Sequence, residues 1–340
     1  TAFGPACFQP DNSFASVYVE EMPPMSEDCL TLNIWAPVTA RHAPVFFWIY
    51  GGALWGGASR DPLYDGARLA ERGIVVVSIN YRLGALGWLA LPALSAESPQ
   101  HISGNYGLLD QIAALKWVQS NISAFGGDPH NVTIAGESAG ALSVMYLMVS
   151  PAARGLFAKA IAESGYLVSM PSLRQSRYGM PAAEQSGLQL AAALHAPSLA
   201  ALRAMDPRKL TDAAAAAHFW PWGVVEPHVL PQQMITAFDK GEEAHVPILA
   251  GFNSGEIRSL ITLAPPTPAS AADYRRIIRE RYGPFADEFL RLYPATDLKE
   301  SILAATRDGL YGWTAMRLVK DQSALGLPSY LYFFDHGYPA

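Results

Sequence analysis

The segment FGGDPHNVTIAGESAG, residues Phe125–Gly140, carries the strongest indication of fold class in this chain. Its middle, Val132–Ala135, is a short apolar run with β-branched residues, which favours a buried strand. This run leads directly into Gly136–Gly140, which matches the G-x-S-x-G pattern of a nucleophile elbow. Glycines on either side of Ser138 allow a sharp turn that presents the hydroxyl at the carboxyl edge of a sheet, where a helix begins.

A serine in front of a helix can also be an ordinary N-cap. The strand before Ser138 and the helical pattern of Ser138–Val149 after it favour the nucleophile instead. A serine hydroxyl attacks a carbonyl only when a base stands beside it and a third group orients that base. The sequence is therefore expected to supply an acid and a base as well.

Short apolar runs alternate with helical patterns along the chain. Such continuous apolar runs favour a sheet that is covered on both faces. Strands that alternate with helices predict an α/β fold with a mainly parallel central sheet and helices on both faces. The predicted strands are Leu30–Trp35, Val45–Tyr50, Ile74–Asn80, Val132–Ala135, Lys159–Ala162, Val246–Ala250 and Ser329–Phe334, and the clearest helices are Gly107–Asn121 and Ser138–Val149.

From Pro171 to about His245 the sequence changes to Ala-rich helical pieces broken by Pro and Gly. These pieces are either peripheral helices or a cap over the active site, and we favour the cap. We predict one domain over residues 1–340, with its core at about 1–170 and 246–340 and the cap at about 171–245.

The composition excludes two classes of function. The chain has 340 residues, a net charge of -6 and no basic run, so it lacks the electrostatic footprint of a nucleic-acid-binding protein. Its longest apolar stretches, such as Val45–Tyr50, are far too short to span a bilayer. We expect a small-molecule substrate and no membrane span.

Two further segments have the composition of catalytic loops. Trp48–Gly57 is a glycine-dense turn after a predicted strand, and such a turn exposes the backbone N–H groups of an oxyanion hole. On its own it can be a simple tight turn, but an elbow serine downstream favours the oxyanion hole. Ile248–Glu256 ends in a carboxylate just past a strand. That carboxylate is either a solvated loop residue or the acid that orients the base.

The chain resembles the type-B carboxylesterases, the branch of the α/β-hydrolase fold that includes cholinesterases and bacterial carboxylesterases. The resemblance implies that fold and a serine carboxylic-ester hydrolase that works through an acyl-enzyme, with no metal or organic cofactor. The segments that carry it are Ser26–Trp35, Trp48–Gly52, Asn80–Gly84, Gly104–Gln111 with Trp117 and Val118, and Phe125–Gly140.

The resemblance also implies roles for single residues. Ser138 matches the nucleophile and Glu256 the acid of the family's triad. The oxyanion hole would consist of the N–H groups of Gly52, Ala53 and Ala139. Alanine at 53 stands where the family usually has a third glycine, but it keeps the N–H group that the hole requires.

Substrate contacts are expected on both sides of the nucleophile. Leu54, after the oxyanion turn, and Glu137, beside Ser138, are the expected contacts near the reacting centre. A group of cap aromatics lies where the family places its acyl pocket, although a buried aromatic cluster is the alternative interpretation. The members of this group are Phe219, Trp220 and Trp222.

The spacing of the two cysteines leaves their pairing open. The resemblance implies a Cys7–Cys29 disulfide, and hence a periplasmic or secreted enzyme. It further implies an ion pair between Arg82 and Asp128 that is structural and not catalytic.

The base is the missing member of the triad. In the chain order serine, acid, histidine, only His336 follows Glu256. However, Tyr330–His336 resembles the strand that precedes the family's catalytic histidine, which lies in a later loop. We therefore expect the base beyond residue 340, with terminal segments of the family missing at both ends, and keep His336 as the alternative.

Other functions remain to be weighed against ester hydrolysis. An amidase or a lactonase would use the same site. A binding or adhesion module of the cholinesterase-like type would have lost its nucleophile, and the presence of both Ser138 and Glu256 argues against it.

Overall fold

The protein is built on one mainly parallel sheet. The structure, a computed structural model, describes residues 2–10 and 24–336. Within them, seven strands are ordered β1-β3-β2-β4-β5-β6-β7, and β1 alone runs antiparallel to its neighbour. All seven predicted strands are present; β7 has the predicted bounds, and each of the others is shifted at one end or both. They are β1 (Leu32–Trp35), β2 (Ala43–Ile49), β3 (Val75–Ile79), β4 (Gly127–Glu137), β5 (Lys159–Glu163), β6 (Ile248–Asn253) and β7 (Ser329–Phe334).

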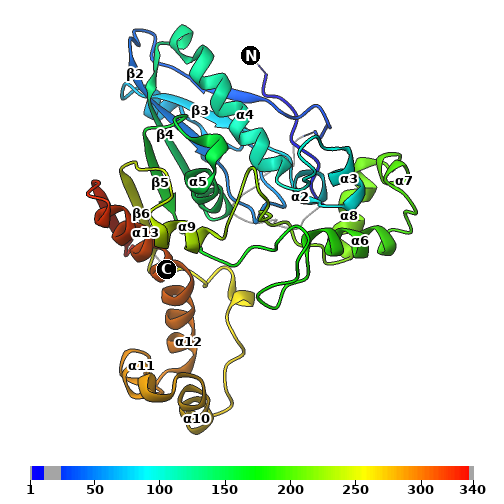
Figure 1. The fold of residues 1–340 in the computed structure, drawn as a ribbon. Coiled ribbons are helices and arrows are strands. Elements are labelled where there is room, and N and C mark those ends of the chain that lie inside the picture. The colour runs from blue at the N-terminus through cyan, green and yellow to red at the C-terminus, as the bar shows by residue number, and fades with distance from the viewer. Residues whose placement is uncertain (1, 11–23, 337–340) are drawn as a thin grey trace.

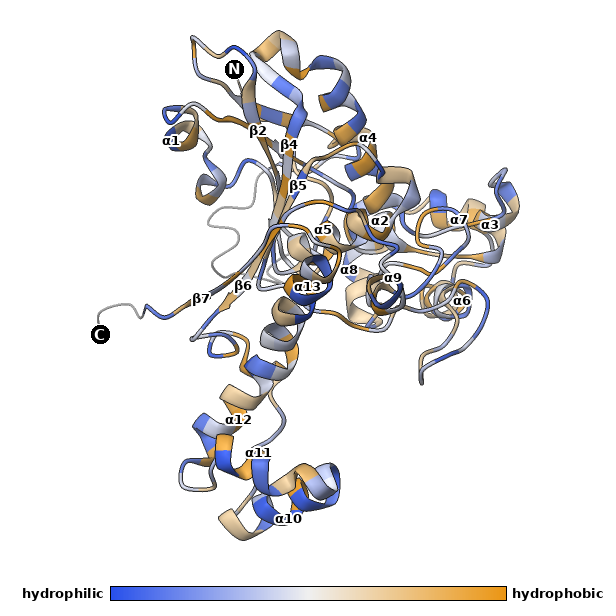
Figure 2. Ribbon diagram, turned by 60° about the vertical axis from the view of Figure 1, so that its left-hand side comes forward, coloured by the Kyte–Doolittle hydropathy of each residue, from blue (hydrophilic) through white to orange (hydrophobic). Residues whose placement is uncertain are grey.

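The two faces of the sheet are covered unequally. On one face, Phe47 and Ile134 are fully buried against α5 (Ala139–Val149), a helix in which every residue is buried. The helices α4 (Tyr106–Asn121) and α13 (Trp313–Ala324) flank α5 on this face, as Figure 2 shows. The opposite face carries the short helix α1, Ala67–Ala70, beside β3. The prediction of helices on both faces is thus confirmed, with most of the helical mass on one side.

The Ala-rich region divides between two places. Three of its helices gather with two short helices of the core at one end of the molecule (Figure 1), where their leucines pack around Trp55. The fourth helix, α9, packs against α5 and α13 and so belongs to the layer on the sheet. The helices are α2 (Gly84–Trp88), α3 (Pro92–Glu97), α6 (Ala183–Ala193), α7 (Leu199–Arg203), α8 (Pro207–Ala216) and α9 (Met234–Lys240).

Three helices between β6 and α13 form an arm that projects from the end of the sheet (Figure 1). No sequence pattern predicted this arm. The arm has its own small core, in which Tyr274, Ile278 and Ile302 are buried. Its helices are α10 (Ala271–Tyr282), α11 (Ala286–Leu292) and α12 (Leu298–Arg307). Short turns complete the chain: η1 (Pro62–Tyr64), η2 (Ile122–Phe125), η3 (Pro151–Ala153), η4 (Ile261–Leu263), η5 (Gly283–Phe285) and the π-helical η6 (Asp308–Gly312).

A helix needs about 20 apolar residues to cross the hydrocarbon core of a bilayer. The α4 helix has 16 residues. Of the helices in the described part of the chain, none combines the length and the apolar character of a membrane span.

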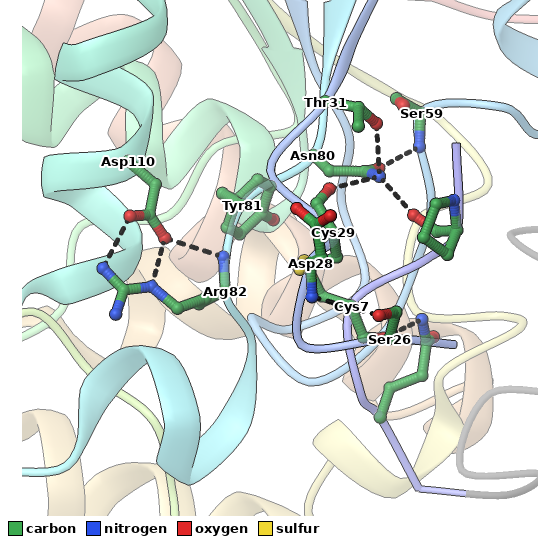
Figure 3. Close-up of a disulfide and its surroundings, with 12 residues drawn as sticks. Cys7, Ser26, Asp28, Cys29, Thr31, Ser59, Asn80, Tyr81, Arg82 and Asp110 are labelled. Carbon is green, nitrogen blue, oxygen red and sulfur yellow. Dashed lines mark hydrogen bonds and ion pairs between the residues drawn. A yellow bond between two sulfur atoms is a disulfide. The ribbon is translucent and has the colours of Figure 1, made fainter. Parts of the chain in front are cut away.

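A disulfide joins Cys7 and Cys29 near the end of β3, as predicted (Figure 3). Asn80 connects the two linked segments, because its amide donates to the carbonyls of Pro5 (2.9 Å) and Cys29 (3.0 Å). Its side-chain oxygen accepts a hydrogen bond from the amide of Ser59 at 3.0 Å. By the chain-entropy estimate, closing a loop of this size contributes roughly 3 kcal/mol to stability.

The predicted Arg82–Asp128 ion pair is wrong. Arg82 instead forms a two-pronged pair with Asp110 of α4, with N–O distances of 2.8 and 2.7 Å (Figure 3). Asp128 accepts a hydrogen bond from the amide of His130. The cause is topological: Arg82 follows the carboxyl end of β3, whereas Asp128 lies at the amino end of β4. In a parallel sheet these two ends are on opposite edges.

The fold buries one carboxyl group with incomplete hydrogen bonding. Glu243 is fully buried, its Oε1 lies 3.5 Å from the amide nitrogen of Gln322, and its Oε2 has no partner among the described residues. Burial is the main cause that raises the pKa of Glu243; Asp321 raises it further, and His245 and Arg154 lower it. Burial therefore makes ionisation of this carboxyl less favourable in the folded protein than in the unfolded chain.

We predict that Glu243→Gln raises the free energy of unfolding at pH 7 by about 1 kcal/mol, because it removes the cost of an ionised buried group. A raised pKa means that the folded state holds the proton more tightly than the unfolded state. The stability from this group is complete below the unfolded pKa and is lost as pH rises through the folded pKa. The gain of Glu243→Gln should therefore shrink as pH is lowered towards 4.

Urea unfolding of the full-length protein between pH 4 and 8 measures this effect. The neighbouring, exposed Glu242→Gln is the matched control and should show little change. A Glu243→Gln variant no more stable than its parent at pH 7 would contradict the prediction.

Candidate active site

Ser138 stands on a strained turn between β4 and α5. Its backbone has φ 55° and ψ -119°, a conformation that non-glycine residues rarely adopt, and its amide donates to the carbonyl of Glu163 at 2.9 Å. The flanking glycines are sterically required. A Cβ at Gly136 would lie 2.5 Å from the carbonyl carbon of Gly140, and one at Gly140 would lie 2.1 Å from the carbonyl oxygen of Ile49. The segment therefore has the geometry of a nucleophile elbow.

The predicted oxyanion turn lies beside this elbow. Gly51 is so close that a Cβ on it would lie 3.2 Å from the Cβ of Ser138. Gly52, Ala53 and Leu54 follow with positive φ values of 99°, 55° and 60°. In the described part of the chain, no acceptor is found for the amides of Gly52 and Ala53. The amide of Ala139, the first residue of α5, is likewise free of a helical bond.

These three amides belong to the residues predicted for the oxyanion hole. Two come from the turn after β2 and one from the start of α5, and both places adjoin Ser138. Free N–H groups beside a serine can stabilise the negative charge of a tetrahedral intermediate. This arrangement is therefore suited to acyl transfer.

Gln9 supports the oxyanion turn from the N-terminal segment, a role that the sequence analysis missed. It is buried, and its amide accepts from the N–H of Gly57 at 2.8 Å and donates to the carbonyl of Gly57 at 3.0 Å. Its amide nitrogen also contacts the carbonyl of Cys7 at 3.2 Å. The disulfide and the oxyanion turn are thus joined through one side chain.

Glu256 is held just beyond β6 by several donors. Its Oε1 accepts a hydrogen bond from the hydroxyl of Ser164. It also accepts from the backbone and side-chain nitrogens of Asn253, at 3.1 and 3.0 Å. Its Oε2 has no partner among the described residues, so one oxygen remains available to an imidazole. The next residue, Ile257, has φ 74°, an unusual strain for a β-branched side chain.

Ser164 was also missed by the sequence analysis. A signal for it exists: a Glu-Ser pair, Glu163-Ser164, follows a predicted strand, and the elbow has the same pair, Glu137-Ser138. Ser164 has φ 50° and is 3% exposed, and it lies at the carboxyl end of β5 next to the nucleophile strand. Its hydroxyl fixes one oxygen of the predicted acid.

The strand order separates Ser138 from Glu256 by one strand. Ser138 follows β4, Glu256 follows β6, and β5 lies between them, which places the strands of Ser138 and Glu256 roughly 10 Å apart. No hydrogen bond in the described part of the chain links a histidine to Ser138 or Glu256. His336 instead sits edge-on against Phe334, with ring centres 6.1 Å apart, and His130 lies near the opposite end of β4.

Carboxylate and tyrosine side chains surround the site. Glu137 adjoins Gly51, since a Cβ there would lie 2.9 Å from its Oε2. Burial, followed by the charge of Glu137, raises the pKa of Tyr64. Burial, followed by the charges of Glu256 and Glu137, raises the pKa of Tyr311. Both phenols therefore keep their protons at neutral pH.

The cap aromatics lie near the oxyanion turn but in a cavity of their own. Phe219, Trp220 and Trp222 line a cavity of about 340 Å³, together with Trp88 of α2 and other residues of the Ala-rich region. Trp55, at the end of the oxyanion turn, packs edge-on against Phe219 with ring centres 6.2 Å apart. The structure thus brings the three predicted aromatics together, and Ser138 is not among the residues that line their cavity.

We predict that Gly140→Ala destabilises the protein by at least about 3 kcal/mol, because its Cβ would overlap the carbonyl of Ile49. Gly309→Ala is the matched control, since a Cβ there meets open space and should cost little. Urea midpoints of the two variants measure the difference. Equal midpoints would show that the elbow adjusts without cost.

Comparison with known proteins assigns the family. The profile of the Carboxylesterase family matches residues 1–339. The chain is 43% identical over 281 residues to the fumonisin B1 esterase of Sphingopyxis macrogoltabida, covering 79% of this chain but only 50% of that protein. It is 36% identical over 342 residues to the para-nitrobenzyl esterase of Bacillus subtilis (strain 168), covering 98% of this chain and 68% of that protein.

Solved structures agree with the sequence matches. A para-nitrobenzyl esterase superimposes with a TM-score of 0.81 at 34% identity, covering 100% of this chain and 70% of that chain. A Geobacillus stearothermophilus carboxylesterase superimposes with a TM-score of 0.82 at 33% identity, with the same coverage. The chain spans between half and about two thirds of the length of these relatives. With the elbow and the mainly parallel sheet, the matches establish that the chain belongs to the carboxylesterase family and has the α/β-hydrolase fold.

Proposed function

We propose that the protein hydrolyses carboxylic esters through an acyl-enzyme, with Ser138 as nucleophile and Glu256 as the acid. One observation carries the proposal: the strained Ser138 adjoins free N–H groups of the oxyanion turn, while Glu256 is held with one oxygen open across β5. We further propose that the base is a histidine beyond residue 340. It would bridge Ser138 and Glu256 and complete the triad.

In the first step, the base takes the proton of the Ser138 hydroxyl as its oxygen attacks the ester carbonyl carbon. The carbonyl oxygen becomes an oxyanion, which the amides of Gly52, Ala53 and Ala139 stabilise. The base then gives the proton to the leaving alkoxide, and the alcohol departs. In the second step, water loses a proton to the base and attacks the acyl-serine, which releases the acid and regenerates the hydroxyl.

The substrate is proposed to be a small-molecule ester. Leu54, which is 1% exposed, and Glu137, which lies against Gly51, are the proposed substrate contacts, while the cavity around Phe219 would accept a group beyond the oxyanion turn. The names of two relatives suggest the first compounds to assay: para-nitrobenzyl esters and fumonisin B1. An amide and a lactone in the same panel separate esterase from amidase or lactonase activity.

The location is proposed to be periplasmic or secreted. The support is the disulfide between Cys7 and Cys29, since such bonds form and persist mainly in oxidising compartments. Thiol titration of the unfolded, unreduced protein isolated from its own cells tests this, and two reactive thiols would count against export.

We predict that Ser138→Ala lowers ester hydrolysis by about 10⁴-fold or more with little effect on the urea midpoint, because the hydroxyl supplies the reacting oxygen and buries little area. An organophosphonate should label the parent protein at Ser138 and leave the variant unlabelled. Ser120→Ala, on the surface of α4, is the control and should keep both properties. Activity of Ser138→Ala within tenfold of the parent would sink the assignment, and a parent that takes no label would favour a binding module.

We predict that Ser164→Ala lowers kcat by about 10- to 100-fold with little change in KM, because a hydrogen bond to a charged group is worth about 1.5–3 kcal/mol. Ser164→Gly also lacks the hydroxyl but suits the backbone φ of 50°, so it should lose activity to the same extent. Steady-state kinetics on a neutral ester measure the split. A rise in KM alone would mean that Ser164 serves substrate binding and not the acid.

A further inference from the structure

One half-buried carboxyl group beside the site has no role in the proposed mechanism. Because β5 lies between the strands of Ser138 and Glu256, the residues at its carboxyl end underlie the space that joins nucleophile and acid. Two polar residues stand there, Glu163 and Ser164. Ser164 binds Glu256. The side chain of Glu163 has no such partner among the described residues. Its backbone carbonyl accepts a hydrogen bond from the amide of Ser138 at 2.9 Å.

The strand register places the Glu163 side chain in a row across four strands. Glu137 of β4 pairs with Glu163, Glu163 pairs with Gly251 of β6, and Gly251 pairs with Tyr332 of β7. Paired residues of neighbouring strands project to the same face of a sheet. Gly251 contributes no side chain, and a Cβ there would lie 2.2 Å from the ring of Tyr332. The Tyr332 ring therefore lies over Gly251, between β7 and the carboxyl of Glu163.

The titratable groups around Glu163 come from each neighbouring element. Glu137 projects from β4, Glu256 follows β6, and Tyr332 projects from β7. Burial raises the pKa of Glu163. Burial first, and then the charges of Glu163, Glu256 and Glu137, raise the pKa of Tyr332, so its phenol stays neutral. Tyr311 of η6 faces Glu256 and Glu137 and stays neutral for the same reasons.

No cation of the described residues is paired with Glu163. Arg307, which bonds the carbonyl of Ser254 near the end of β6, is engaged with Asp308. A half-buried carboxylate without a cationic partner is unfavourable on its own. It becomes favourable when a positive charge forms beside it.

We propose that Glu163 is a tuning residue whose carboxylate stabilises the positive charge that the base acquires when it takes the proton of Ser138. The inference rests on the proposed function, because the imidazole that bridges Ser138 and Glu256 is the group that acquires this charge. A nearby opposite charge favours the charged form of a titratable group and shifts its pKa by roughly one unit or more, so Glu163 is expected to raise the pKa of the base by about one unit.

The test is the pH dependence of kcat/KM for a neutral ester in the full-length protein. Loss of a negative neighbour makes an imidazolium more acidic, so the base is free at lower pH. Glu163→Gln should move the acid limb of the profile down by about one pH unit. Glu163→Asp keeps the charge and should leave the limb near that of the parent, as should Glu280→Gln on the exposed surface of α10.

Three outcomes decide the inference. An acid limb that stays in place in Glu163→Gln overturns it, and so does an equal shift in Glu163→Asp, which would indicate a packing role. If Glu163→Gln does not fold, Glu163→Ala repeats the neutral substitution under the same criterion. If Ser138→Ala still hydrolyses the ester, the proposed function itself has failed; if Ser138→Ala is inactive but the limb does not move, only the role of Glu163 has failed.

Discussion

The contact between the elbow and strand β2 is the constraint on which the site depends. Gly140 approaches the carbonyl of Ile49 so closely that no side chain fits between them, and Gly136 meets both segments. This contact fixes the position of Ser138 relative to the carboxyl end of β2. The same strand end continues into Gly51 and Gly52, so Ser138 and the predicted oxyanion turn are positioned by a single backbone approach. A strained Ser138 persists because the surrounding backbone fixes it from both sides.

The rest of the site is built outward from β4 in both directions across the sheet. Towards β2 and β3, the oxyanion turn is held by Gln9, which connects it to the disulfide of the N-terminal segment. Towards β5 and β6, Ser164 and Asn253 hold Glu256. Each strand end thus contributes one part, and the strand order decides which parts face one another. This is the general rule for parallel α/β sheets, in which sites form at the carboxyl ends of strands.

The features that could be predicted from the sequence are those with a local cause. Apolar runs mark the strands, and the glycines around Ser138 mark a turn that few other sequences tolerate. Partners across the fold are a different matter, because they depend on strand order and on which edge a residue occupies. Asp110 and Asp128 are both aspartates, and the sequence alone does not show which of them pairs with Arg82. Only the topology of the sheet puts Asp110 beside Arg82. The role of Gln9 has the same origin.

The α10–α12 arm was missed for another physical reason. Its helices are largely polar and bury a narrow stripe of residues such as Tyr274 and Ile302 against one another and not against the sheet. A short amphipathic pattern of this kind does not reveal that the helices leave the body of the fold. Prolines and charged residues between them resemble those of any surface loop. The arm is visible only once the segments are placed in space.

The arm affects the dynamics of the loop that carries Glu256. A small separate core opens at a lower free energy than a central sheet, so the arm is expected to behave as its own cooperative unit in hydrogen exchange. The loop that carries Glu256 connects β6 to this arm. Arg258 pairs with Glu300 of α12 at 2.8 Å, and Arg307 at the end of α12 bonds the carbonyl of Ser254 at 3.2 Å. Local opening of the arm would break both interactions, so the lifetime of an ordered Glu256 is coupled to helices whose own core lies outside the sheet.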